Sequence, residues 1–145
     1  MLLVTPEIDA MLDGHTHLGV FPTIEAEILF GVFSAGHLVR LSRKKTKQKP
    51  DLEMLDGYDE VWAMCIRKPR PGWRILGRWF DEIEGQRVFV ALRAWDKNKL
   101  FATYPTAAQE VTDDWDELFG GISPKRATEL GEYVGGVYND LDKPT

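Results

Sequence analysis

Three runs of apolar residues between Tyr58 and Lys99 have the length and the β-branched and aromatic content of strands. They span residues 61–66, 73–80 and 87–95, and short turns containing Pro or Gly separate them. Connections this short favour antiparallel neighbours. We therefore expect a three-strand antiparallel meander in the middle of the chain.

Helical signals precede this segment. Residues 5–7 read Thr-Pro-Glu, which combines an N-cap residue, a Pro at the first helical position and an acid in the first turn, and Gly14 would end this helix. A second helix is expected from residues 22–23, because apolar residues then recur at helical spacing. It ends near Ser34 or continues to about Leu41.

Helical signals also follow the meander. Pro105 opens a helix in which acids fill the gaps between apolar residues, and Gly120 ends it. Ser123 is the expected N-cap of a last helix, with Leu130 and Val134 on its buried side. The predicted fold class is therefore α+β: N-terminal helices, then a small antiparallel sheet with C-terminal helices packed on it.

The composition predicts one soluble, folded domain. The chain has 145 residues, of which 43% are hydrophobic, with five Trp and seven Phe to build a core. No apolar run reaches the roughly 18 residues that span a bilayer, and the start does not resemble a signal peptide. The single cysteine, Cys65, lies in an apolar strand, so we expect it to be buried and structural in a cytoplasmic protein.

Charge is distributed unevenly along the chain. The net charge is -5, but residues 1–39 carry -5, residues 40–99 carry +6 and residues 100–145 carry -6. A basic middle between acidic ends indicates a polyanionic partner. The alternative is that folding brings the segments together and cancels the field.

Arginines and lysines are concentrated on the predicted strands and directly after them: Arg67, Lys68, Arg70, Arg74, Arg78, Arg87, Arg93, Lys97 and Lys99. Arg74 and Arg78 are four residues apart, so on a regular strand they share a face. Arginines on adjacent strands can converge into a phosphate-binding surface. The alternative is a surface on which these arginines pair with the acids of the chain.

Residues 40–49 read RLSRKKTKQK, with six positive charges and no acid. They form either a frayed helix end or an exposed loop, and Lys44 and Lys45 are candidates for contact with nucleic acid.

The string DGHTHLG, which contains His15 and His17, is similar to the first metal-binding segment of amidohydrolases. That barrel fold needs about 250 residues and eight βα units, which this chain does not supply. A coincidence in a loop is the favoured interpretation, and a small metal hydrolase using these two histidines is a third alternative for the function.

The stretch YDEVWAMCIRKPRPGWRILGRWF, together with VFVALRAWDKNKL after it, resembles the RelE/HigB-like toxins of bacterial type II toxin–antitoxin systems. The resemblance covers roughly residues 24–118 of a single domain formed by residues 1–145, with a C-terminal helical extension at about 121–145. It implies a helical hairpin before an antiparallel sheet. It also implies a first strand before the helices, for which residues 1–4 are the only short candidate.

The resemblance implies an mRNA endonuclease that acts on the ribosome without a metal or other cofactor. The 2′-OH of one nucleotide attacks its own 3′-phosphate and expels the 5′-oxygen of the next. Arg67 and Arg74 would stabilise the developing charge, Lys97 or Lys99 would assist proton transfer or bind phosphate, and Tyr104 would act as an acid or stack on a base. The implied partners are mRNA, the ribosome and a cognate antitoxin, with no membrane and no small-molecule cofactor.

Six further cations are predicted to contact nucleic acid: Lys44, Lys45, Lys68, Arg70, Arg78 and Arg93. The chain departs from the family in its net acidity, in its greater length and in having no histidine in the site region. One hypothesis is that the acidic C-terminal helices cover the basic face. The alternative function is a non-catalytic nucleic-acid- or protein-binding module of the same fold, from a phage or mobile element.

Overall fold

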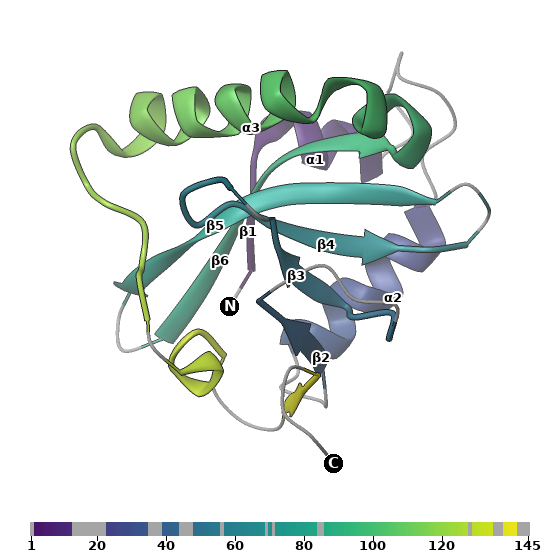
Figure 1. Cartoon of the computed structure of the whole chain (residues 1–145), viewed down its shortest axis with the longest axis horizontal. Coiled ribbons are helices and arrows are strands. Elements are labelled where there is room, and N and C mark those ends of the chain that lie inside the picture. Colours follow the sequence, from purple (N-terminus) through teal and green to yellow (C-terminus); the bar gives the residue numbers. More distant parts are fainter. Residues whose placement is uncertain are drawn as a thin grey trace.

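The three strands expected between Tyr58 and Lys99 lie at the centre of a larger sheet in the computed structural model of the chain (Figure 1). They are β4 (Trp62–Ile66), β5 (Trp73–Ile83) and β6 (Gln86–Asp96), and both pairs of neighbours run antiparallel. The structure describes residues 2–12, 23–34, 39–43, 48–55, 57–68, 70, 72–83, 86–127, 129–134 and 138–141.

Four short strands extend this centre on both sides: β1 (Leu2–Val4), β2 (Val39–Ser42), β3 (Leu52–Met54) and β7 (Tyr138–Asp140). The sheet has seven strands in the order β1-β6-β5-β4-β3-β2-β7. β1 runs parallel to β6, and β2 runs parallel to both β3 and β7. The sheet is therefore mixed, and β1 lies where residues 1–4 were the only candidate for a first strand.

The predicted fold class was wrong, because the sheet is not a three-strand meander. Residues 39–42 form a strand, although a helix end or loop was expected there. β2, β3 and β7 have only three or four residues each, too few to produce a readable alternation. Long-range pairing holds these short segments in the sheet, whereas their local sequence carries almost no strand signal.

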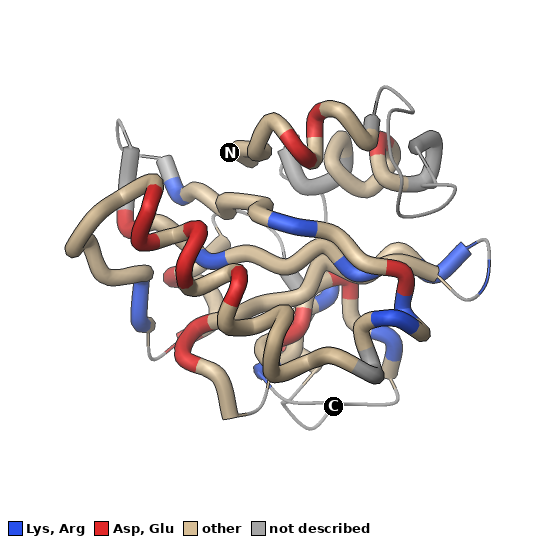
Figure 2. The backbone as a smooth tube through the Cα atoms, turned by 90° about the horizontal axis from the view of Figure 1, so that it is seen from above, with Lys and Arg blue, Asp and Glu red and all other residues tan. Residues whose placement is uncertain are grey.

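The helices cover both faces of the sheet. α1 (Pro6–Leu12) and α2 (Thr23–Ser34) lie on one face and α3 (Lys97–Phe119) on the other, as Figure 2 shows from above. Each face has its own core. The α1–α2 core contains Ile8, Phe30, Trp62, Trp79 and Phe89. The α3 core contains Ala63, Leu76, Val90, Val111 and Trp115.

α3 begins earlier than the expected start at Pro105 and consists of two parts. The carboxylate of Asp96 caps it by accepting hydrogen bonds from the backbone N–H groups of Asn98 and Lys99, at 2.9 and 3.3 Å. Thr103 interrupts it with a non-helical φ of -136°, directly before Tyr104 and Pro105. Proline cannot donate to the preceding turn, which accounts for the kink.

The last helix predicted from Ser123 is absent from the described residues. Residues 122–127 are non-helical, and the backbone N–H of Lys125 donates to the carbonyl of Trp79 at 2.7 Å. A single 3-10 turn follows at Leu130–Glu132. Leu130 and Val134 are buried, as expected, but in the α1–α2 core. Contact with β5 and with this core replaces the local helical tendency.

Two glycines allow strands to approach each other closely. A Cβ at Gly77 would lie 2.0 Å from the carbonyl oxygen of Val90 on β6. Gly72, at φ +86°, opens β5, and a Cβ there would lie 2.5 Å from the carbonyl oxygen of Ile66 on β4. Neither position accommodates a side chain without backbone movement.

Candidate functional site

The side chain of Arg74 lies on the face of the sheet that α3 covers. It lies opposite Cys65 on β4 and opposite Trp95 on β6. Alternate residues of a strand share a face, and Leu76, two residues further on, belongs to the α3 core. Arg74 is only 8% exposed, so a guanidinium lies at the edge of an apolar core.

Arg74 and Arg67 form no ion pair with an acid among the described residues. Arg74 Nη1 donates a hydrogen bond to the carbonyl oxygen of its neighbour Trp73, at 3.1 Å. Burial lowers the pKa of Arg67, and the charges of Arg74 and Arg40 lower it further. A mostly buried arginine beside a half-buried one is an arrangement that an anion would stabilise.

Tyr104 reaches the surroundings of Arg74 from α3, directly after the kink. Burial raises its pKa, and Glu53, Cys65 and Tyr58 raise it further, while Arg74 opposes them. Tyr58 and Tyr104 both pack against the α3 core. The phenol of Tyr104 is therefore held in its protonated form beside Arg74 at neutral pH.

Cys65 lies at the centre of this group and is buried, as expected. Burial raises the pKa of its thiol to about 11, Arg74 and Arg67 act against that shift, and Glu53 and Asp51 add to it. A thiol this hard to ionise is not a nucleophile at neutral pH. We name the group formed by Glu53, Cys65, Arg67, Arg74 and Tyr104 the Arg74 cluster.

The structure thus brings three of the five predicted catalytic residues together, namely Arg67, Arg74 and Tyr104. The other two, Lys97 and Lys99, lie in the first turn of α3, and the backbone N–H of Lys97 donates to the carbonyl of Gly72 at 2.9 Å. They therefore begin a helix beside the turn that opens β5.

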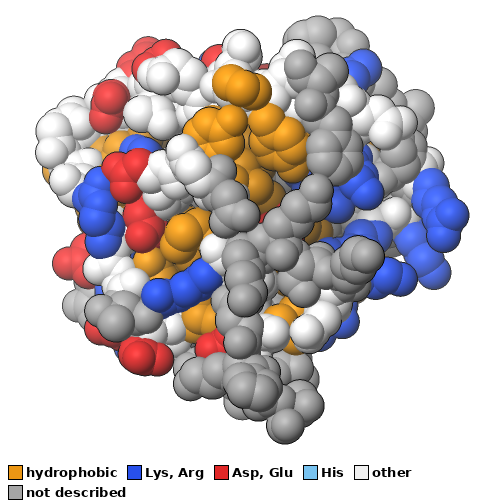
Figure 3. All heavy atoms as spheres, in the orientation of Figure 1, with side chains coloured by type: hydrophobic (Ala, Val, Ile, Leu, Met, Phe, Trp, Pro, Cys, Tyr) orange, Lys and Arg blue, Asp and Glu red, His pale blue; other side chains and the backbone are white. Residues whose placement is uncertain are grey.

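Lys68 and Arg70 are exposed between β4 and β5. Figure 3 shows Lys and Arg side chains gathered at the side of the molecule where β4 ends and β5 begins, with Asp and Glu mainly on the opposite side. This basic side is continuous with the end of the sheet that holds the Arg74 cluster.

Arg93, predicted to bind nucleic acid, pairs with α3 instead. Its Nε donates to Asp114 at 2.6 Å, its Nη1 to Glu110 at 3.0 Å and its Nη2 to Asp114 at 3.1 Å. The hydrogen bond to Asp114 raises the pKa of Arg93. This arginine ties β6 to the acidic part of α3.

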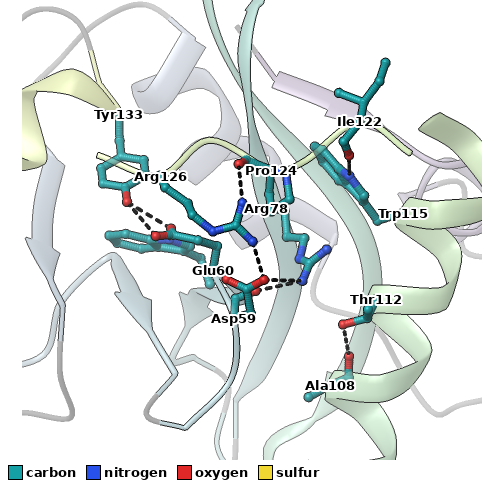
Figure 4. A network of polar contacts seen from close by, with 11 residues as sticks. Asp59, Glu60, Arg78, Ala108, Thr112, Trp115, Ile122, Pro124, Arg126 and Tyr133 are labelled. Carbon is teal, nitrogen blue, oxygen red and sulfur yellow. Dashed lines mark hydrogen bonds and ion pairs between the residues drawn. The ribbon is translucent and has the colours of Figure 1, made fainter. Parts of the chain in front are cut away.

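Arg78, also predicted to bind nucleic acid, is 3% exposed and serves a second internal contact. Its Nη2 donates to the carbonyl of Asp59 at 2.8 Å and lies 3.9 Å from the Asp59 carboxylate (Figure 4). Its guanidinium lies 5.9 Å from the centroid of the Trp115 ring. Arg78 and Arg93 therefore follow the alternative expected from the sequence, in which arginines of the sheet pair with acids of the chain.

Four predicted positions lie outside the described residues: Lys44, Lys45, His15 and His17. Among the residues that the structure does describe, no three His, Cys, Asp or Glu side chains are grouped so as to hold a metal ion. In the same part of the chain, no helix combines the length and apolarity needed to cross a membrane.

Sequence reasoning missed Glu53 and Tyr58. Glu53 lies on the three-residue strand β3, opposite Ala63, and Tyr58 lies in the turn before β4. Neither belongs to a motif, and only the pairing of β3 with β4 brings Glu53 to the cluster. Within the C-terminal segment that was hypothesised to cover the basic face, Leu130, Tyr133 and Val134 pack in the α1–α2 core on the opposite face instead.

Comparison of the chain with protein-family models, with curated proteins and with solved structures finds no match.

Proposed function

We propose that the chain is an endoribonuclease of the RelE/HigB-like toxin type, which cleaves mRNA on the ribosome by attack of a 2′-OH on the adjacent phosphate. The observation that carries the proposal is the convergence of Arg67, Arg74 and Tyr104 on one face of the sheet, where neither arginine pairs with an acid among the described residues. Two cations and a protonated phenol are what such a reaction requires.

The arginines receive the phosphate. Two guanidinium groups bind its non-bridging oxygens and stabilise the extra charge that develops as the pentavalent phosphorane forms. Arg74 is mostly buried, so its charge acts in a medium less polarisable than water and is more effective there.

Tyr104 and Glu53 carry out the proton transfers of the reaction. The O2′–P bond forms and the P–O5′ bond breaks, leaving a 2′,3′-cyclic phosphate on one product. Glu53 accepts the proton of the 2′-OH, and Tyr104 donates its phenolic proton to the departing O5′. The raised pKa of Tyr104 keeps that proton in place until the oxygen leaves. Lys97 and Lys99 bind neighbouring phosphates.

The test is cleavage of mRNA in a translation extract, mapped by primer extension, together with growth of cells that express the chain. We expect cuts in the coding region and growth arrest, and both effects should disappear in the Arg67→Ala/Arg74→Ala variant. Lys125→Ala is the matched control, because it removes a cation that pairs with Asp81 outside the cluster. Harmless expression with unaffected translation would contradict the proposal.

The proposal also includes a cognate antitoxin encoded next to this chain. Co-expression of the neighbouring gene product should restore growth and should yield a stable complex on purification. A neighbour that neither binds nor protects would remove this part of the proposal.

A second candidate function is a non-catalytic module that binds nucleic acid or protein. The pairing of Arg93 and Arg78 with acids favours it, because it reduces the positive surface open to RNA. The net charge of -5 acts in the same direction. Retention of a labelled RNA without cleavage would select this function over the nuclease.

A further inference from the structure

A turn with a strained backbone separates β3 from β4. Glu60 has φ +52°, in the left-handed region that residues other than glycine seldom adopt. Such a conformation persists when surrounding contacts hold it, and it is frequent at functional sites. Here the surrounding contacts come from both faces of the sheet.

The C-terminal segment also holds this turn, with Tyr133 on the α1–α2 side. Tyr133 donates its hydroxyl proton to the carboxylate of Glu60, with both oxygens 2.9 Å away, and Arg126 forms an ion pair with Asp59 (Figure 4). Tyr133 is fully buried, and its ring centroid lies 5.0 Å from that of Trp62. Its hydroxyl also accepts a hydrogen bond from the N–H of Ala127 at 3.0 Å.

The sheet holds the same turn from the other side. Arg78 of β5 reaches the carbonyl and the carboxylate of Asp59, so that two arginines meet on one acid. On the α1–α2 side, Trp62 Nε1 also donates to Glu60, at 3.2 Å. We name these five residues, Asp59, Glu60, Arg78, Arg126 and Tyr133, the turn clamp.

The turn also carries Tyr58, directly before Asp59. Tyr58 and Tyr104 pack against the same α3 core, and Tyr58 is among the groups that raise the pKa of Tyr104. The backbone that the clamp fixes is therefore continuous with a side chain that borders the Arg74 cluster.

We propose that Tyr133, from the α1–α2 core, and Arg126, from the C-terminal segment, are positioning residues that fix the turn at residues 57–60 so that Tyr58 lies beside Tyr104. This inference rests on the proposed function for its catalytic consequence. Its structural part, the coupling of the clamp to the two tyrosines, does not.

The test uses the full chain labelled with 13C at the Cζ of each tyrosine ring, which gives four signals because the chain has four tyrosines. Tyr58→Phe and Tyr104→Phe assign their two signals. Tyr133→Phe keeps the buried ring but loses the hydrogen bond to Glu60, and Arg126→Ala removes a half-exposed side chain. We expect both clamp variants to shift the signals of Tyr58 and Tyr104, and Arg126→Lys to restore them.

Lys125→Ala is the matched control, because Lys125 lies in the same C-terminal segment but pairs with Asp81 and not with the turn. It should leave both signals in place. In the cleavage assay, the clamp variants should lower kcat severalfold with less change in KM, since the phosphate-binding arginines remain.

Unchanged Tyr58 and Tyr104 signals in both clamp variants would overturn the inference, as would shifted signals with an unchanged kcat. If the native chain cleaves no RNA, the proposed function fails, and the ring signals alone then decide whether the clamp positions the two tyrosines.

Discussion

Two groups of arginines lie on the same face of the sheet and differ in what surrounds them. Arg78 and Arg93 meet acids of the 59–60 turn and of α3. Arg67 and Arg74 meet Cys65, a tyrosine and each other, with no ion pair among the described residues. For Arg93 the difference follows α3, whose acids lie after the kink at Thr103 and whose lysines lie before it.

This contrast shows that residue type and strand position do not determine the role of an arginine. Arg74 and Arg78 lie on one strand, four residues apart, and both are buried. Arg78 lies beside an acid that neutralises it, and we propose that Arg74 binds an external anion. Whether an arginine has a structural or a functional role depends on whether the rest of the chain places an acid beside it.

The largest expected effect is that of Arg74→Ala on cleavage. Loss of a charge-stabilising donor in such a site lowers kcat by ~10²–10³-fold. Its free energy of unfolding should change less than that of Arg78→Ala, because Arg74 loses no ion pair. Cleavage rates and urea unfolding, measured on the same preparation, check both. An Arg74→Ala variant that is unstable but fully active would contradict this expectation.

Tyr104→Phe should lower the cleavage rate by about 10²-fold while RNA binding is retained, because it removes the proton donor and keeps the ring. Filter binding and single-turnover cleavage separate the two effects. Lys125→Ala, which removes a cation paired with Asp81 outside the cluster, is the control. An equal loss of binding in Tyr104→Phe would point to stacking or contact instead of acid catalysis.

Arg78→Ala should lower the free energy of unfolding by about 2 kcal/mol, because it leaves the carbonyl of Asp59 without this donor and removes the contact with the Trp115 ring. Urea unfolding followed by tryptophan fluorescence measures the change. Arg78→Met retains most of the packing and should recover part of the loss. An unchanged midpoint would show that this arginine is not structural.

The smallest expected effect concerns the exposed cations at the turn between β4 and β5. Lys68→Ala and Arg70→Ala should each lower the slope of log affinity for single-stranded RNA against log salt by about 0.7, as expected for one lost phosphate contact. Lys125→Ala should leave the slope unchanged. Equal slopes in all three variants would place the RNA path elsewhere.

Much of the central sheet could be predicted, because its strands are long and rich in β-branched and aromatic residues. β4, β5 and β6 lie close to the expected ranges, and α1 begins after Thr5 as its N-cap signal indicates. The fold class was still wrong. The short strands β2, β3 and β7 depend on partners distant in sequence, and the segment after Gly120 follows the sheet despite its helical signals.

The site was predictable only in part. The family resemblance implied Arg67, Arg74 and Tyr104, and strand alternation placed Arg74 on one face with Arg78. The structure places Arg74 near both Arg67 and Tyr104. The same alternation gave no means to separate Arg74 from Arg93, because the acids that neutralise Arg93 lie about twenty residues further on, in α3. Glu53 was not predictable, because it reaches the cluster only through the pairing of β3 with β4.

Strand β1, at one edge of the sheet, has a consequence for folding kinetics. Leu2 pairs with Phe89, so this edge closes only after a loop spanning most of the chain has formed. Sheets with such distant pairings commonly fold in milliseconds to seconds, far more slowly than local helical folds. Until β1 docks, β6 presents an unpaired edge, which other chains can join at high concentration. Refolding yield should therefore fall as protein concentration rises.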